Sequence, residues 1–258
     1  MIRTLLCCAM VTAASATFAD ESMSFMCGEL TNAFGPFDYR SELGKTVDSN
    51  GGHSPIRLVE GAHFTPEVEA LVRGKTATTA GFDLDYTLRA FPNHHRALLS
   101  MMNLSFKEKK TKPLGSHYTI DCWFERGARW RPDDAVVKLL WGIYKLKTGR
   151  QNEAIELFQK AEQANEEDAN LFYNLGLAYF EVKRYDDALR YAHKAYALNY
   201  PLPGLREKLK RAGAWRDMPP PAAEQSAPVA TQSAPAALQS QPVVPQSAPA
   251  AAAPPKTP

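Results

Sequence analysis

Two consecutive stretches in the second half of the chain decide its fold. They are AVVKLLWGIYKLKTGRQNEAIELFQKAEQANEED, residues 135–168, and ANLFYNLGLAYFEVKRYDDALRYAHKAYALNYPL, residues 169–202, which align without a gap. Under this alignment Gly142 falls on Gly176, and two further pairs of small residues coincide, Ala154 with Ala188 and Ala161 with Ala195. A fixed period of this length indicates a repeated supersecondary unit whose neighbours stack on one another.

Each of these stretches has the pattern of two amphipathic helices. In residues 169–181, Leu171, Leu175, Ala178 and Tyr179 recur at steps of three and four residues, which is the period of one helix face. The segments KTGR (147–150) and VKRY (182–185) mark the turn inside each unit. Glycine and alanine are expected where the two helices of a pair approach closely, because only small side chains leave room for the neighbouring backbone.

This spacing of small residues resembles the tetratricopeptide repeat family. The consensus of that family has small residues at the eighth, twentieth and twenty-seventh positions of its unit. The resemblance implies an all-α solenoid of helix-turn-helix units, with two clear repeats at 135–168 and 169–202.

One more unit is expected upstream, in a degenerate form. Stepping back by one period from Ala154 and Phe158 lands on Ile120 and Phe124, so the segment before Pro132 reads as a second helix. The first helix follows Pro92, with Asn93 as the predicted N-cap and an apolar face made by Ala97, Leu98, Met101, Met102 and Leu104. The lysine-rich stretch KEKKTKPLGSH separates the two helices, so residues 93–134 are predicted to be a degenerate repeat with an insertion.

The ends of the array need covers, because a terminal repeat would otherwise expose an apolar face. Residues 203–216 are predicted to form a capping helix with a stripe of Leu205, Leu209 and Ala212, and Gly213 suits its exit. Residues 20–92 are predicted to be an irregular, partly helical head. Short helices are expected after Thr65, ending near Gly74, and again before Pro92. The head and the stretch DLDYTLRAFPNHHRAL resemble exported repeat proteins of proteobacteria.

The two termini are predicted to lie outside the folded part. Residues 1–19 have the layout of a secretory signal peptide, with Arg3, a short apolar run and a cleavage point after Ala19. The run is too short to span a bilayer, so we expect a periplasmic or secreted protein with no membrane span in the mature chain. Residues 217–258 are rich in Pro, Ala, Gln and Ser and are predicted to be a disordered tail.

Two cysteines, Cys27 and Cys122, remain after processing. In an exported protein they are candidates for a disulfide, and the alternative is two unrelated buried thiols. Removing the signal peptide leaves 29 Lys and Arg against 28 Asp and Glu, and such a balance argues against nucleic acid as the main partner. No nucleophile elbow, phosphate-binding loop or dinucleotide motif occurs, so we expect no enzymatic activity and no cofactor.

The expected function follows from the resemblance. Tetratricopeptide arrays bind protein or peptide partners on a concave face made by the first helix of each unit, so a partner in the cell envelope is predicted. The resemblance places on this face Arg96, Leu99, Asn103 and Phe106 of the degenerate unit, Val136, Leu139, Ile143 and Leu146 of the next, and Asn170, Tyr173, Asn174, Leu177 and Phe180 of the last, with Ser100, Lys147 and Glu181 beside them. The alternative is that the head itself fills this groove.

The adjacent histidines His94 and His95 stand where a helix is predicted to begin. Neighbouring helical residues diverge by about 100°, so the pair cannot present two metal ligands from one face. We interpret them as exposed or partly packed residues of the first turn. The alternative function is a metal- or small-molecule-binding head built from Cys27, His63, His94, His95 and Tyr118. The sequence determines neither the identity of the partner nor the oligomeric state.

Overall fold

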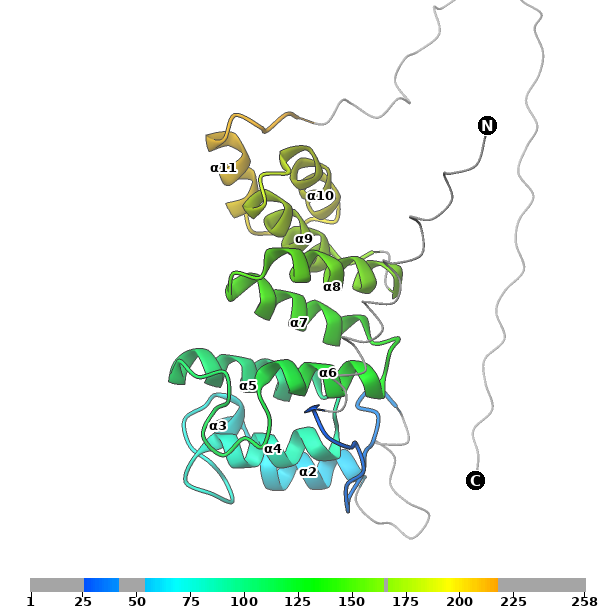
Figure 1. Ribbon diagram of the computed structural model, residues 1–258, viewed down its shortest axis with the longest axis vertical. Coiled ribbons are helices and arrows are strands. Elements are labelled where there is room, and N and C mark those ends of the chain that lie inside the picture. The colour runs from blue at the N-terminus through cyan, green and yellow to red at the C-terminus, as the bar shows by residue number, and fades with distance from the viewer. Residues whose placement is uncertain (1–25, 42–53, 165–166, 218–258) are drawn as a thin grey trace, which may run out of the picture. The chain divides into compact units, whose positions relative to one another are not determined.

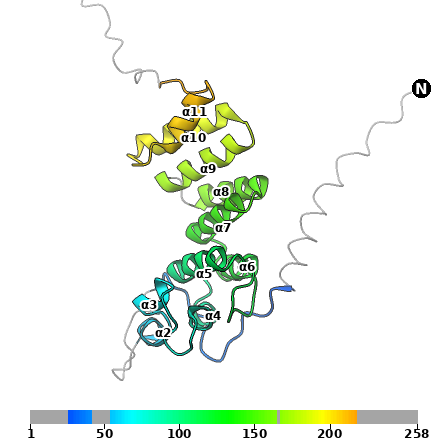
Figure 2. The ribbon, with the colours of Figure 1, turned by 90° about the vertical axis from the view of Figure 1, so that its left-hand side faces the viewer.

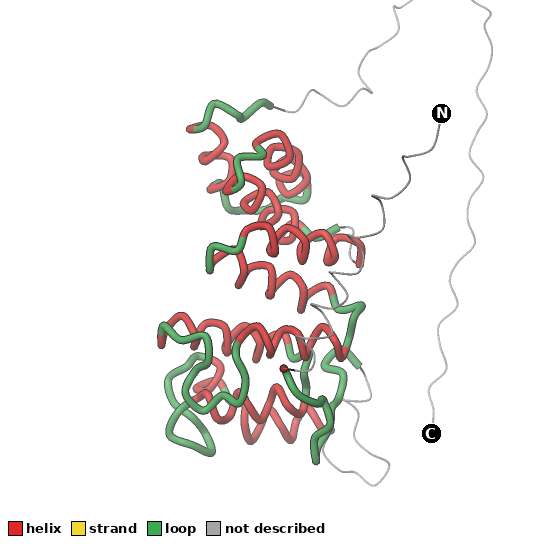
Figure 3. The backbone as a smooth tube through the Cα atoms, viewed as in Figure 1, coloured by secondary structure: helices red, strands yellow, loops and turns green. Residues whose placement is uncertain are grey.

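The structure is a computed structural model that describes residues 26–41, 54–164 and 167–217. The predicted signal peptide and the predicted disordered tail from residue 218 onward lie outside the described residues. All described residues belong to one compact unit that ends at Asp217. Within them the regular structure is entirely helical, as Figure 3 shows, and this confirms the predicted all-α class.

Ten helices form this unit, labelled as in Figure 1. They are α2 (Pro55–His63), α3 (Pro66–Glu69), α4 (Ala80–Ala90), α5 (His95–Glu108), α6 (Ile120–Trp130), α7 (Ala135–Lys147), α8 (Gln151–Ala164), α9 (Ala169–Glu181), α10 (Tyr185–Ala197) and α11 (Gly204–Arg211). The described helices contain none that is long and apolar enough to cross a bilayer.

The two predicted 34-residue units are helix pairs, α7 with α8 and α9 with α10, which we call the trailing pairs. Figures 1 and 2 both show them one after the other along the stack. Their contact points are the small residues of the repeat. A methyl group added at Gly142 would overlap the ring of Phe158, and one at Gly176 would lie 2.5 Å from Leu205. The glycines are therefore needed for the close approach of neighbouring helices.

The degenerate unit is the pair α5 and α6, and the predicted apolar face of α5 is buried. Its N-cap is not the predicted Asn93. The His94 side chain accepts the backbone N–H of Ala97, while Asn93 donates through its amide to Asp38 and Asp134. An aromatic nitrogen has replaced the expected amide oxygen as the cap, because Asn93 is drawn into contacts with the head and with the next unit.

The head is more regular than its sequence indicated, because it contains a further helix pair, α2 and α4. The N-cap residues of successive first helices are Ser54, His94 and Asp134, so α2, α5 and α7 begin 40 residues apart. The same interval separates α4 from α6, which follow Thr79 and Thr119. The chain thus contains two 40-residue units before its two 34-residue units. We call α2 with α4 and α5 with α6 the leading pairs.

The helices α4 and α6 match in detail. Each has 11 residues, and each carries an ion pair between an acid and an arginine four residues later, Asp85 with Arg89 and Glu125 with Arg129. Each also ends in the same turn, in which the C-cap N–H donates to the carbonyl four residues earlier. The α3 helix is part of the insertion in the first of these units, and it ends at Glu69 rather than near Gly74 as predicted. Leu71 takes the left-handed conformation there.

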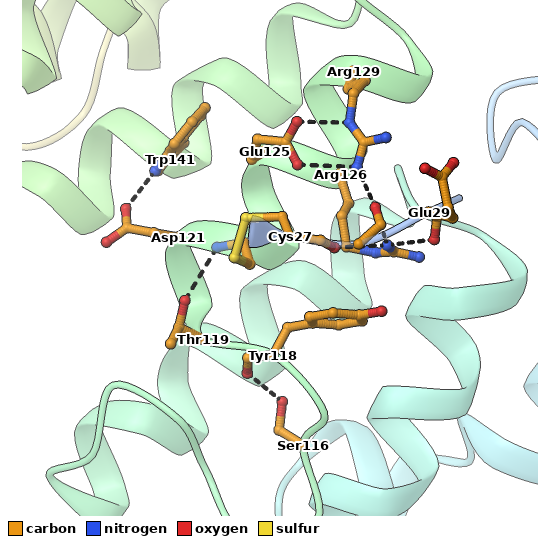
Figure 4. The surroundings of a disulfide bond; sticks show 12 residues. Cys27, Glu29, Ser116, Tyr118, Thr119, Asp121, Glu125, Arg126, Arg129 and Trp141 are labelled. Atoms are coloured by element: carbon orange, nitrogen blue, oxygen red, sulfur yellow. Dashed lines mark hydrogen bonds and ion pairs between the residues drawn. A yellow bond between two sulfur atoms is a disulfide. The ribbon is translucent and has the colours of Figure 1, made fainter. Parts of the chain in front are cut away.

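Residues 26–41 fasten the leading pairs together from one side. Cys27 forms a disulfide with Cys122 of α6, which confirms the first of the two alternatives for these cysteines (Figure 4). The fully buried Arg126 donates to the carbonyl oxygens of residues 27, 28 and 29 at 2.9, 3.1 and 2.7 Å. The ring of Tyr118 lies 4.5 Å from its guanidinium group. Backbone carbonyls and an aromatic face thus solvate this buried cation.

At the other end, α11 covers the last pair as predicted. Leu205 and Leu209 are fully buried against α9 and α10. The helix is shorter than the predicted range of 203–216, and Ala212 is exposed rather than part of the apolar stripe, because it is already the C-cap residue. Gly213 leaves the helix with a φ of 68°, a conformation that glycine adopts without steric cost.

Candidate functional site

The candidate site is the set of first-helix residues predicted to bind a partner, which we call the inner face. It lies on three neighbouring helices, α5, α7 and α9, and α7 packs on both of the others. The fold therefore brings residues from three units, more than 80 positions apart in the sequence at the extremes, onto adjacent helices. A helix stack places side chains from one position of each unit in a row, because each unit repeats the same geometry.

Two of the predicted contact residues belong to the core instead. Leu139 and Tyr173 are 5% and 8% exposed and pack in the hydrophobic cluster of the trailing pairs. The ring of Tyr173 stacks on Tyr200 at 4.3 Å, so the segment after α10 covers it. Tyr200 lies near the end of the second unit, and its ring covers the face of Tyr173 that a partner residue would need to contact. The prediction was wrong for these two positions, because family position alone does not show what covers them.

The remaining apolar positions are half-buried or exposed. Leu99 is 41% exposed, and five others are half-buried: Phe106, Val136, Ile143, Leu146 and Leu177. Phe180 is also half-buried, but the ammonium group of Lys208 lies 5.2 Å from its ring centroid, so α11 partly covers it. These half-exposed aliphatic and aromatic groups lie in successive units. Binding of a partner that removes them from water would lower the free energy.

The polar positions divide into bound and available groups. Asn174 donates to the carbonyl and to the side chain of Asn170 at 2.8 and 2.9 Å, so these two amides hold each other. Asn103 lies exposed in the middle of α5. The Arg96 guanidinium donates to Glu69 in a two-pronged contact, and this bond keeps the pKa of Arg96 above its usual range. Arg96 is therefore engaged by the head.

The head covers part of the inner face, as one of the sequence alternatives proposed. Beside the contact with Arg96, the hydroxyl of Ser100 donates to the carbonyl of Glu69 at 3.0 Å, and Lys107 donates to the carbonyl of Leu71 at 2.8 Å. These contacts come from α3 and the residue pair after it, and they involve α5 alone. Leu99 and Asn103 stay exposed between them. Among the described residues, these hydrogen bonds between the head and the inner face are all made on α5.

A buried polar junction beside the inner face was not predicted, and Asp134 is at its centre. Its carboxylate caps α7 and also accepts from Asn93 and His95, with Arg40 3.3 Å away. Burial raises the pKa of Asp134, but the bonds from His95 and Asn93 and the charge of Arg40 outweigh it, so the pKa lies below its usual value. The local sequence around Asp134 indicates no more than a capped helix start. The partners of Asp134 come from segments up to about 94 residues away, and no local sequence pattern predicts them.

Within the described residues, His94 and His95 are not grouped with further side chains that could hold a metal ion. The His94 ring is fully buried, contrary to our interpretation, between the rings of Tyr39 and Phe64 at 4.1 and 4.7 Å. Burial lowers the pKa of His94 despite its contact with Glu60, so burial favours the neutral ring. His95, half-buried, binds Asp134 at 2.9 Å.

The other members of the proposed metal cluster also interact with other groups of the protein. Cys27 is in the disulfide, Tyr118 lies under Arg126, and His63 binds Asp83 at 2.9 Å and stacks on Tyr86. Among the described residues, no three His, Cys, Asp or Glu side chains are placed to hold a metal ion. A hollow of about 470 Å³ does lie beside His95, lined also by Tyr39, Arg40, Ile56, Glu60 and Arg96. Its charged groups already pair with one another or with neighbouring carboxylates.

Comparison with known proteins agrees with the helix pattern. The chain matches a family model described as TPR repeat over residues 145–183 and one described as tetratricopeptide repeat over residues 169–201. Together with the two trailing pairs, these matches define an array of helix-turn-helix repeats. Residues 145–201 of the chain are therefore tetratricopeptide repeats.

Several solved structures show a partial likeness to this chain. The crystal structure of MamA protein has a TM-score of 0.45 and 15% sequence identity, and the match covers 61% of this chain and 82% of that one. A structure of pilF from Pseudomonas aeruginosa has the same TM-score and 21% identity, with 61% and 67% covered. The search of curated proteins gave no match. The family assignment rests on the two model matches and on the observed helix pairs.

Proposed function

We propose that the protein is an exported scaffold that binds a polypeptide partner in the cell envelope through its inner face. Proteins built from tetratricopeptide repeats are typically interaction scaffolds rather than enzymes. The observation that carries the proposal is the row of half-exposed apolar residues, Val136, Ile143, Leu146 and Leu177, on two adjacent first helices. An extended or helical segment of the partner would bury them. Export is supported by the signal-peptide pattern of residues 1–19.

Site-specific photocrosslinking tests the binding proposal. A photoreactive residue in place of Leu177 or Ile143 is expected to give a discrete crosslinked product with one protein in cells. The control position is Glu156, which is exposed on α8 in the second helix of the same unit as Ile143 and is expected to give no such product. Equal products from the inner-face and control positions would contradict a binding site on the inner face.

Export is tested separately, so that the two parts of the proposal can fail independently. Cell fractionation is expected to place the chain outside the cytoplasm, and N-terminal sequencing of the purified protein is expected to begin at Asp20. A chain that keeps Met1 and fractionates with cytoplasmic markers would refute export and leave the binding proposal intact.

A further inference from the structure

Six exposed cations gather where α5 ends. They are Arg73 and Lys75 in the connection between α3 and α4, Lys107 in the last turn of α5, and Lys109, Lys110 and Lys112 in the lysine-rich insertion. We call this group the basic rim. Among the described residues, none of the six has a carboxylate oxygen within 4.0 Å of its charged group, and Glu67 interacts with Arg73 and Lys75 only over a longer distance.

The two stretches of the basic rim lie side by side. The Nζ atom of Lys107 donates to the backbone carbonyl of Leu71 at 2.8 Å, and this bond brings the stretch 71–75 against the end of α5. Glu108 is the acid inside the lysine stretch, and its carboxylate accepts the N–H of Leu114 at 2.8 Å. The carboxylate of Glu108 therefore stabilises the conformation of the loop through this bond. The six cations act as one surface, because their stretches are joined by a direct bond.

Many cations elsewhere in the described residues form ion pairs with acids, in contrast to those of the basic rim. Arg131 pairs with Asp38 at 2.7 Å, Arg150 with Asp121 at 2.7 Å and Lys194 with Glu162 at 2.8 Å. The whole chain is nearly neutral, with 30 Lys and Arg against 28 Asp and Glu. The basic rim is therefore a local excess of positive charge on a nearly neutral protein. Such a surface attracts negatively charged groups from solution.

The basic rim is continuous with the inner face. Phe106, an inner-face residue, directly precedes Lys107, and the Nζ atom of Lys147 from α7 lies 5.5 Å from its ring centroid. Exposed apolar side chains also stand among the cations, since Val72 is 73% and Leu114 54% exposed. The surface therefore passes from half-buried apolar groups on α7 to cations at the end of α5.

We propose that the basic rim receives an acidic stretch at one end of the polypeptide segment whose apolar side chains lie on the inner face. This inference rests on the proposed function and names the chemistry of the partner. Each exposed ion pair contributes little by itself. Six cations acting together speed the association of an acidic partner and fix the direction in which it lies, and salt weakens both effects.

Selection from a random library of 12-residue peptides tests the inference and does not require that the partner be identified. Wild-type protein is expected to select peptides that combine spaced apolar residues with Asp and Glu grouped at one end. The variant K109E/K110E/K112E is expected to select the same apolar pattern without the acidic group. The control variant K160E/K183E/K210E changes three exposed lysines elsewhere by the same charge and is expected to select as the wild type does.

Fluorescence anisotropy of one selected acidic peptide measures how much the basic rim contributes to binding affinity. Its Kd is expected to rise about tenfold in the rim variant at 50 mM salt and to stay within about twofold in the control variant. In wild-type protein, raising the salt to 500 mM is expected to weaken binding about as much as the rim variant does.

The outcomes separate this inference from the proposed function. Selected peptides with apolar residues but no acidic excess would overturn the inference and leave the inner face as a binding site. Failure of the wild-type protein to select any peptide would overturn both. Vesicles with 30% anionic lipid provide the remaining arm. If the wild-type protein binds these vesicles, the rim variant does not, and the selected peptides show no preference for acids, the basic rim is a lipid-binding surface. That outcome would also overturn the inference.

Discussion

The leading and trailing pairs have the same helix arrangement but are held together differently. In the trailing pairs, small residues such as Gly142 and Gly176 let large apolar groups of the neighbouring helix fill the space directly. In the leading pairs, a disulfide, the buried Arg126 and the Asp134 junction join segments far apart in the sequence. The comparison teaches that one repeat geometry can be stabilised by close packing or by long-range polar links, and that the first leaves a clear sequence period.

Removal of the disulfide is expected to give the largest difference in stability between the leading and the trailing pairs. The variant C27S/C122S removes a link that closes a loop with a sequence separation of 95, which stabilises by up to about 4–5 kcal/mol in the chain-entropy model. It also frees the carbonyl groups that solvate Arg126. Hydrogen exchange measured by mass spectrometry should show faster exchange in residues 26–41 and 80–130, with the trailing pairs little changed. Equal acceleration throughout the chain would mean that the two regions unfold as one unit.

The N-caps Asp134 and Asp168 provide a matched pair across the two regions. Both cap a first helix by accepting two backbone N–H groups, but only Asp134 is also bound by Asn93, His95 and Arg40. Asp168→Ala should lower the free energy of unfolding by about 1 kcal/mol, the usual value of a cap.

Asp134→Ala should cost about 3 kcal/mol, because it leaves buried polar groups without their partner. Chemical denaturation of both variants measures the difference. Similar losses for the two substitutions would show that the long-range bonds to Asp134 add no stability.

Acid should act on the leading pairs first. Burial raises the pKa of Asp38, but bonds from Asn93, Arg40 and Arg131 outweigh it and lower the pKa from 3.8 to about 2. The pKa of Asp134 is lowered as well. A depressed carboxyl pKa adds stability above the unfolded value, and this stability is lost as pH falls through the folded value.

The window for this effect is therefore pH 4 to 2, where each such group contributes a loss of roughly 1 kcal/mol per pH unit. Circular dichroism and tryptophan fluorescence over this range, with the variant Asp38→Asn as control, measure it. The variant should have a flatter acid profile than wild type, and a profile of unchanged slope would contradict the assignment to Asp38.

The smallest effect concerns two helical glycines in different surroundings. Gly142→Ala places a methyl group on the ring of Phe158 and should destabilise by about 1 kcal/mol after the gain in helix propensity is subtracted. Gly61→Ala in α2 meets no atom within 4 Å and should stabilise by about 0.5 kcal/mol. Thermal melts of both variants measure the opposite signs. Stabilisation by both would mean that close packing at Gly142 is not required.

The sequence predicted the trailing pairs well and the leading pairs only in part. At an interval of 34 residues, Ala154 and Phe158 led correctly to Ile120 and Phe124, which are buried in α6. The same interval missed α2 and the relation of α4 to α6, because an insertion lengthens each leading unit to 40 residues. The signals were present, since Thr79 and Thr119 begin these two helices and Pro92 and Pro132 follow them.

The inner face was predictable in its location and less so in its membership. Positions such as Ile143 and Leu177 are half-exposed, whereas Leu139 and Tyr173 are buried. The cover over Tyr173 comes from Tyr200, which lies after α10 near the end of the second repeat. The basic rim was visible only as lysines in an insertion. Its connection to Arg73 and Lys75 required the contact between Lys107 and Leu71.

The sequence by itself determined the helix period, the small residues at the helix contacts and the pair of cysteines available for a bond. These features are local or strictly periodic, and elementary packing and helix geometry are enough to interpret them. The tertiary structure alone decided which polar groups meet, among them Asp134 with Arg40 and Arg126 with the carbonyl groups next to Cys27. The physical reason is that a buried charge is stabilised by whatever partner the fold brings within hydrogen-bonding distance, and that partner can lie about 90 residues away.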